Sequence, residues 1–142
     1  ASLLEDIVKS EPENVEARVV LARAVLFSDT QRAVGLVDGI EAPLLSDDLE
    51  TISVAARLRD LCERRLQLTA SPVREAYLRA AGRFLAGDYD EALAGFIGVI
   101  RDERMFDDDG SRKACLAIFR ILGEEHEITL RHRRDFGSAL YV

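Results

Sequence analysis

Apolar residues recur three or four positions apart through nearly every segment of this chain, a spacing that places them on one face of an α-helix. Long runs that alternate β-branched and polar residues, as a half-buried strand requires, are missing from the sequence. Proline occurs only at Pro12, Pro43 and Pro72, and each position suits the start of a helix or the gap between two helices. The sequence therefore predicts an all-α fold.

The segments between these breakers predict about eight helices. A helix over residues 12–27 is apolar around most of its circumference, and a long helix over residues 47–68 has an apolar stripe that includes Cys62 and Leu66. Ser71 and Pro72 suit the cap and first turn of the next helix. Five of the predicted helices cover residues 2–9, 12–27, 47–68, 72–86 and about 125–140. The other three are marked by the apolar residues of segments 33–40, 92–100 and 115–122, the second of them beginning near Tyr89.

Length and charge limit what such a helical chain can do. Its 142 residues, 48% hydrophobic and 32% charged, suffice for one domain with a buried core. No apolar run approaches the roughly 18 residues that span a bilayer, so no membrane segment is expected. Residues 1–50 contain eleven acidic and four basic residues, a net charge of −7, whereas the remainder nets to zero. This balance disfavours nucleic acids and anionic membranes as partners, because both attract cationic faces.

Motifs for catalysis or cofactor binding are missing from the sequence, which has no Gly-rich phosphate loop, nucleophile elbow or zinc-protease signature. The acidic run at residues 107–109 precedes Gly110, but a calcium loop would need acidic residues where Met105 and Leu116 stand. We expect this run to be a solvated turn that caps a helix. We therefore expect no enzymatic activity, no metal and no cofactor.

The cysteines and histidines are expected to have structural roles. Cys62 and Cys115 lie 53 positions apart on predicted inward stripes, which favours reduced, buried thiols. The spacing of His126 and His132 puts them on different helical faces and disfavours a shared metal. His132 falls on an apolar stripe and is expected to be half-buried and hydrogen-bonded, with pH sensing or catalysis as the alternative. His126 is expected at the surface.

Residues 76–100, AYLRAAGRFLAGDYDEALAGFIGVI, resemble the tetratricopeptide repeat, a 34-residue helix–turn–helix unit. Tyr77 and Phe84 stand where the repeat has large aromatic residues, and Ala92 where the second helix has a small one. A weaker copy is visible in the first third of the chain. The two degenerate repeats cover about residues 13–42 and 72–104, with the helix over 47–68 between them. The resemblance implies TPR-like hairpins in a right-handed superhelical stack.

The region from Asp109 to Leu140 resembles one particular group of tetratricopeptide-repeat proteins. Its order of motifs, with Leu122-Gly123 followed by the Arg-rich start of the last helix at Arg131, is similar to the end of the bacterial thioredoxin–tetratricopeptide co-chaperones (the YbbN-like, or chaperedoxin, family). The resemblance implies a cytoplasmic module that binds unfolded clients and passes them to a chaperonin or Hsp70-type chaperone. It also implies a preceding thioredoxin-like domain, and the start at Ala1 suggests a piece of a longer protein.

Two groups of residues are candidates for partner contact. The first is the predicted groove of the second repeat, with Tyr77, Arg79, Arg83 and Phe84. Aromatic residues at these spacings are more often core residues, so burial of the two aromatic side chains is the alternative.

The second group belongs to the last helix and comprises Arg131, Arg134, Tyr141 and Val142. The arginines could contact acidic partner residues, or pair with nearby acidic side chains. The apolar chain end could insert into a partner such as a chaperonin, or pack back on the preceding helix. A different function is also open, namely a self-associating scaffold, such as a homodimer, that positions a missing domain without binding clients.

Overall fold

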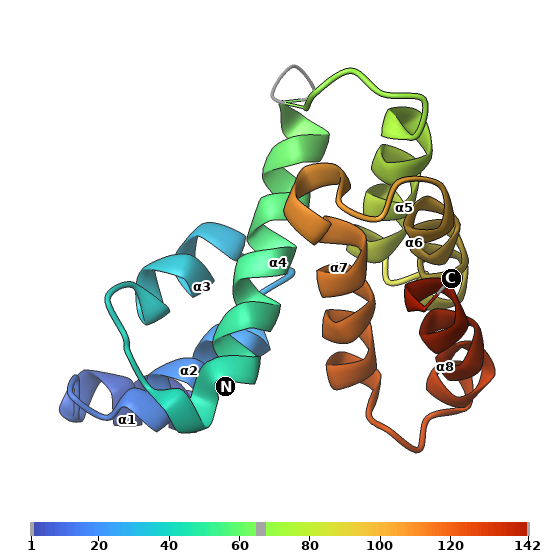
Figure 1. Ribbon diagram of the computed structural model, residues 1–142. Helices are drawn as coiled ribbons and strands as arrows, with labels where there is room; N and C mark the ends of the chain where they lie inside the picture. Colours follow the sequence, from blue (N-terminus) through green and yellow to red (C-terminus); the bar gives the residue numbers. More distant parts are fainter. Residues whose placement is uncertain (1, 65–67, 142) are drawn as a thin grey trace. The chain divides into compact units, whose positions relative to one another are not determined.

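The computed structural model describes residues 2–64 and 68–141, and within them every regular element is a helix (Figure 1). The prediction of an all-α fold with about eight helices is confirmed. The elements are α1 (Ser2–Ser10), α2 (Val15–Val25), α3 (Thr30–Val37), the 3₁₀ helix η1 (Pro43–Leu45), α4 (Ser46–Glu63), α5 (Arg74–Leu85), α6 (Tyr89–Glu103), α7 (Phe106–Leu122) and α8 (Glu127–Leu140).

Local capping explains where the observed helices differ from the predicted ones. α2 begins at Val15, not at Pro12, because the Asn14 side chain accepts a hydrogen bond from the Ala17 amide at 3.0 Å. α4 ends at Glu63, five residues before its predicted end, and Leu66 of the predicted stripe lies outside the described residues. No helix in the described parts of the chain is long and apolar enough to cross a membrane.

The chain forms two compact units, residues 1–56 and residues 57–142. The first unit contains α1, α2, α3 and the start of α4. Its core includes Leu21, Ala33 and Ile52, each at most 1% exposed. The single domain anticipated from the sequence stays a prediction.

The second unit contains two helical hairpins, α5–α6 and α7–α8 (Figure 1). The helices of the first hairpin approach most closely at Gly95 of α6, where a Cβ atom would lie 2.9 Å from the Cβ of Ala80 on α5. The second hairpin is held by the rings of Phe119 and Phe136, whose centroids lie 5.3 Å apart in an edge-to-face arrangement. Close packing of small residues therefore allows the large aromatic side chains to interlock around them.

An acidic turn of left-handed backbone begins α7. Asp107, Asp108 and Asp109 have φ angles of 55°, 56° and 64°, a conformation that costs non-glycine residues about 1–2 kcal/mol each. The expectation of a solvated turn was wrong for two of the three residues. Only 9% of the Asp107 side chain and 12% of the Asp109 side chain are exposed, against 92% for Asp108. Asp107 holds the turn in place because it accepts hydrogen bonds from Arg57 and Tyr77, whereas Asp109 accepts one from Arg112 in the next turn of α7.

Candidate protein-interaction surface

The two aromatic groove candidates, Tyr77 and Phe84, are core residues. Tyr77 is 1% exposed and Phe84 is not exposed at all. The Tyr77 ring packs edge-to-face against Phe96 and Phe106, with centroid distances of 5.6 and 5.2 Å. The candidate contact of these two aromatic side chains with a partner therefore gives way to the alternative, burial in the core. They are buried because α6 and the start of α7 cover the inner face of α5.

The Tyr77 hydroxyl connects the core to the left-handed turn. It donates a 2.7 Å hydrogen bond to Oδ2 of Asp107, whose Oδ1 accepts a 2.6 Å hydrogen bond from the Arg57 guanidinium. Burial first, and the negative charge of Asp107 second, raise the pKa of Tyr77. The hydrogen bond to Asp107 likewise raises the pKa of Arg57. A buried phenol, a carboxylate and an arginine thus fix the position of the turn between α6 and α7.

The outer face of α5, defined by Glu75, Arg79 and Arg83, is exposed along its length. Arg79 and Glu75 border a surface hollow of about 350 Å³, and Leu78 and Cys62 are also among the described residues that line it. Arg83 forms an ion pair with Asp88 at 3.2 Å and half of its side chain remains exposed. Both arginine candidates of the first group therefore lie at the surface, and Arg79 lies next to an apolar side chain and a half-buried thiol.

The last helix presents a second exposed face. Leu130 is 65% exposed, Tyr141 is 90% exposed, and the intervening Arg134 is also exposed, all at helical spacing along α8. Tyr141 does not pack back on the preceding helix, although Phe136 is buried and Leu140 is half-buried. Val142 lies outside the described residues.

Arg131, the remaining candidate, pairs within the chain and joins α8 to α6. Its guanidinium contacts Asp90 of α6 at 3.0 Å and Glu127 at 2.9 Å. His132 reaches the same Asp90 oxygen, with Nε2 at 2.6 Å. Since an ionised carboxylate only accepts hydrogen bonds, Nε2 carries the proton. The expectation of a half-buried, hydrogen-bonded His132 is confirmed. For Arg131, the structure shows the second of the two expected roles, pairing with acidic side chains of the chain itself.

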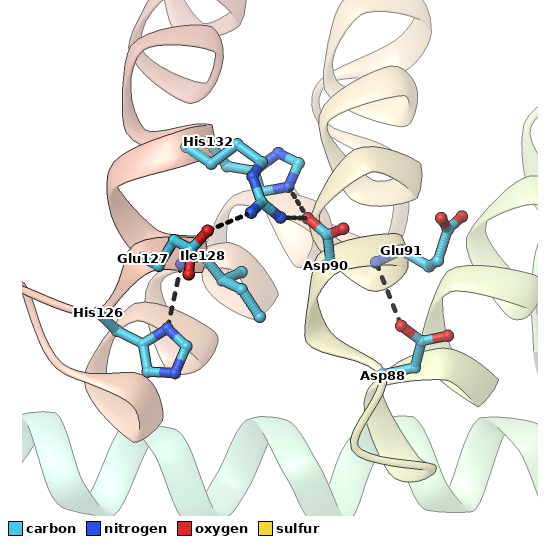
Figure 2. Close-up of polar contacts among 8 residues, drawn as sticks. Asp88, Asp90, Glu91, His126, Glu127, Ile128 and His132 are labelled. Atoms are coloured by element: carbon cyan, nitrogen blue, oxygen red, sulfur yellow. Dashed lines mark hydrogen bonds and ion pairs between the residues drawn. The ribbon is translucent and has the colours of Figure 1, made fainter.

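Two further contacts of this hairpin escaped the sequence analysis. His126 is exposed as expected, but it also caps α8, because its Nδ1 accepts a 3.0 Å hydrogen bond from the Ile128 amide (Figure 2). Arg133 contacts both carboxylate oxygens of Glu124 at 2.8 Å and lies 4.6 Å from the centre of the Phe119 ring. Of the arginine cluster at the start of α8, Arg134 therefore projects most freely from the helix pair.

From the contacts of Asp90 we predict that removing its charge lowers the stability of the protein by an amount that depends on pH. Hydrogen bonds from His132 and then Arg131 hold the pKa of Asp90 below its ordinary value of 3.8. A carboxylate whose pKa is lowered in the folded state stabilises that state fully when the pH is above the pKa of the unfolded chain. This contribution is lost as the pH falls through the lower, folded-state pKa. We expect Asp90→Asn to lower the melting temperature by about 1–4 °C at pH 6, because the site is partly exposed.

Melting curves between pH 2.5 and 6 measure this effect. The difference between wild type and Asp90→Asn is expected to shrink below about pH 4, where the wild-type carboxylate takes up a proton. Asp102→Asn, on the exposed side of the same helix, is the control and is expected to leave the melting temperature unchanged at pH 6. A difference for Asp90→Asn that stays constant down to pH 2.5 would contradict this assignment.

The thiols differ in their surroundings. Cys115 is fully buried, and burial raises the pKa of its thiol. Cys62 is half-buried and lines the hollow beside Arg79, so the expectation that both cysteines are core residues was wrong for Cys62. Its place at the end of the stripe on α4 leaves one side of the thiol facing the hollow. Among residues 2–64 and 68–141, no cluster of three or more potential metal ligands occurs.

Comparison with known proteins identifies the second unit. A family model described as tetratricopeptide repeat matches residues 54–141, which is more than half of the chain. The matched range starts within α4 and includes both hairpins of the second unit, whereas the weaker copy at residues 13–42 lies outside it. The chain has no match among curated proteins or among solved structures.

Proposed function

This chain belongs to the tetratricopeptide-repeat family, whose domains mediate protein–protein interaction, and we propose that it is the protein-binding part of a thioredoxin-linked co-chaperone. In this role it holds unfolded client segments and passes them to a chaperonin or Hsp70-type chaperone. The similarity of residues 109–140 to that co-chaperone family supports the proposal, together with the match to the repeat family.

The observation that carries the proposal is the exposed face of α5. Unfolded proteins present apolar and acidic side chains in extended segments. The hollow beside Arg79 has Leu78, which is 8% exposed, in its lining, and Arg79 and Arg83 offer positive charge along the same face. Tyr77 and Phe84 support this face from below and do not contact the client. We therefore assign the contact with the client to the α5 face.

The outer face of α8 is the proposed contact for the receiving chaperone. Leu130 and Tyr141 are the large apolar side chains of this face, and Arg134 lies between them. Tyrosine and arginine are both enriched among the residues that contribute most to binding at protein interfaces. Two separate faces allow a client to stay bound while the chaperone docks.

Light scattering tests the proposal. A chemically unfolded model protein is diluted from denaturant into buffer with an equimolar amount of the purified chain, with and without chaperonin. We expect the chain to suppress aggregation of the client. Unchanged scattering would contradict the proposal, and if the chain's apparent mass also rises with concentration, the scaffold function is favoured instead.

Variants of the exposed faces locate the client contact within the same assay. We expect Arg79→Glu combined with Arg83→Glu to abolish most of the suppression, since a client segment would meet reversed charge on the α5 face. Arg101→Glu is the matched control, because Arg101 is an exposed arginine on α6 that does not line the hollow. Equal losses for the control and the double variant would remove the α5 face as the contact.

A further inference from the structure

The first unit has a hollow of its own. α3, the turn after it and the first half of α4 enclose a volume of about 310 Å³. Most of its lining is aliphatic and includes Val34, Val37, Ile40, Leu49 and Ile52. Ile52 is 1% exposed and forms the floor, whereas Val34 is 41% exposed and lies at the opening. The surface therefore offers an apolar recess that solvent reaches from one side.

The turn after α3 borders this recess. Gly39 has a φ angle of +75°, left-handed backbone that favours glycine. α3 therefore ends at Val37, and the chain turns to Ile40, which also lines the recess. Asp38, which is exposed, is the charged residue in the lining.

The charge around the recess indicates the chemistry of its occupant. Residues 1–56 have eleven acidic and four basic residues, so the entire net charge of the chain, −7, belongs to this unit. Three of the four basic side chains are bound within the unit. Arg18 donates to the Leu36 carbonyl at 2.8 Å, Arg23 pairs with Asp48, and Arg32 pairs with Glu5. The unit that contains the apolar recess therefore has an acidic excess, and Asp38 brings one of these negative charges into the lining.

We propose that this recess in the first unit docks a basic amphipathic helix of a partner protein. The apolar side chains of such a helix, spaced three or four residues apart, enter between α3 and α4. Its lysine and arginine side chains meet the acidic excess of the unit. The volume, near the lower end for ligand sites, suits two or three aliphatic side chains. This surface lies in a different unit from the α5 face and does not depend on client binding.

A pair of synthetic peptides tests the charge requirement on the intact chain. Both are 18 residues long, carry leucine at the same helical positions and a fluorescent label, and differ only in having lysine or glutamate on the polar face. We expect the lysine peptide to bind at least about 10-fold more tightly in 50 mM salt, and its affinity to fall as salt rises to 500 mM. Equal affinities, or no binding of either peptide, would overturn the proposal.

A matched pair of variants separates docking in the recess from general attraction to an acidic protein. Val34→Lys places a charged side chain across the opening, whereas Val20→Lys adds the same charge at a 47% exposed valine on α2, outside the recess. Fluorescence anisotropy is expected to show at least about 10-fold weaker binding for Val34→Lys and less than about 2-fold for Val20→Lys. Equal weakening by both variants would overturn the site. Both valines are exposed, and far-UV circular dichroism checks that each variant remains folded.

Discussion

Replacing Tyr77 with alanine is expected to lower the free energy of unfolding by about 3–5 kcal/mol, the largest effect of any substitution considered for this chain. The side chain is 1% exposed, and its removal leaves a cavity between Phe96 and Phe106. The Asp107 carboxylate also loses the hydroxyl that donates to it, at a turn that already holds three residues in left-handed backbone. Chemical denaturation followed by circular dichroism measures the loss.

Two companion variants separate the causes of this loss. Tyr77→Phe keeps the ring and removes only the hydrogen bond to Asp107, so we expect a smaller loss of about 1–3 kcal/mol. Tyr141→Ala removes the same side chain at a 90% exposed position and is expected to change stability by less than about 0.5 kcal/mol. A Tyr77→Ala protein as stable as Tyr141→Ala would show that the Tyr77 side chain does not hold α5 to the turn.

The close approach of α5 and α6 predicts the second large effect. Gly95→Leu is expected to destabilise the protein by about 1–3 kcal/mol, because even a Cβ atom at this position lies 2.9 Å from the Cβ of Ala80. A larger side chain must push the two helices apart and disturb the packing around Phe96. The midpoint of denaturant unfolding reports the change.

Gly98→Leu is the matched control on the same helix. A Cβ atom at Gly98 meets nothing within 4 Å, and replacing glycine within a helix lowers the entropy of the unfolded chain. We therefore expect Gly98→Leu to leave stability unchanged or to raise it by up to about 1 kcal/mol. If Gly95→Leu were as stable as Gly98→Leu, the interhelical contact would not limit the size of residue 95.

Helical periodicity was sufficient to predict the architecture of the chain. Apolar residues at 3.6-residue spacing, together with three prolines at helix boundaries, identified all eight helices, and the errors lay at helix ends. The ends depend on capping contacts such as that of Asn14, which the periodicity of apolar residues does not encode. The resemblance of residues 76–100 to a tetratricopeptide repeat was specific because it rested on the positions of large and small residues, and the family match includes this segment.

Periodicity failed where a role depended on residues far away in the sequence. It placed Tyr77 on a helix face but could not show whether another helix covers that face; the partner of its hydroxyl is 30 residues away. Asp107 looked solvated because its neighbours are acidic, yet Arg57, 50 residues earlier, binds it. Likewise, the sequence shows Asp90 only as an ordinary acidic residue in a first helical turn, and it does not indicate the contact that His132 makes with it from α8. Long-range polar pairs leave no periodic signal in one sequence.

The burial of the aromatic side chains also determines which candidate residues of α5 remain exposed. Because Tyr77 and Phe84 are buried, the surface that we propose for partner binding on the first hairpin consists of the outward side chains of α5. Arg79 and Arg83 remain at the surface because a charged side chain on this face reaches water, whereas the opposite face is apolar and packed. The central claim is therefore that an unfolded client contacts the chain at the α5 face.

Site-specific photo-crosslinking tests this claim most directly. A photoreactive amino acid replaces Arg79 in one variant and Arg101 in another, and each protein is irradiated with a labelled unfolded client. The account predicts a covalent adduct of the client with the variant labelled at position 79 and little or none with the variant labelled at position 101. Equal adducts from both positions, or adducts from position 101 alone, would contradict it.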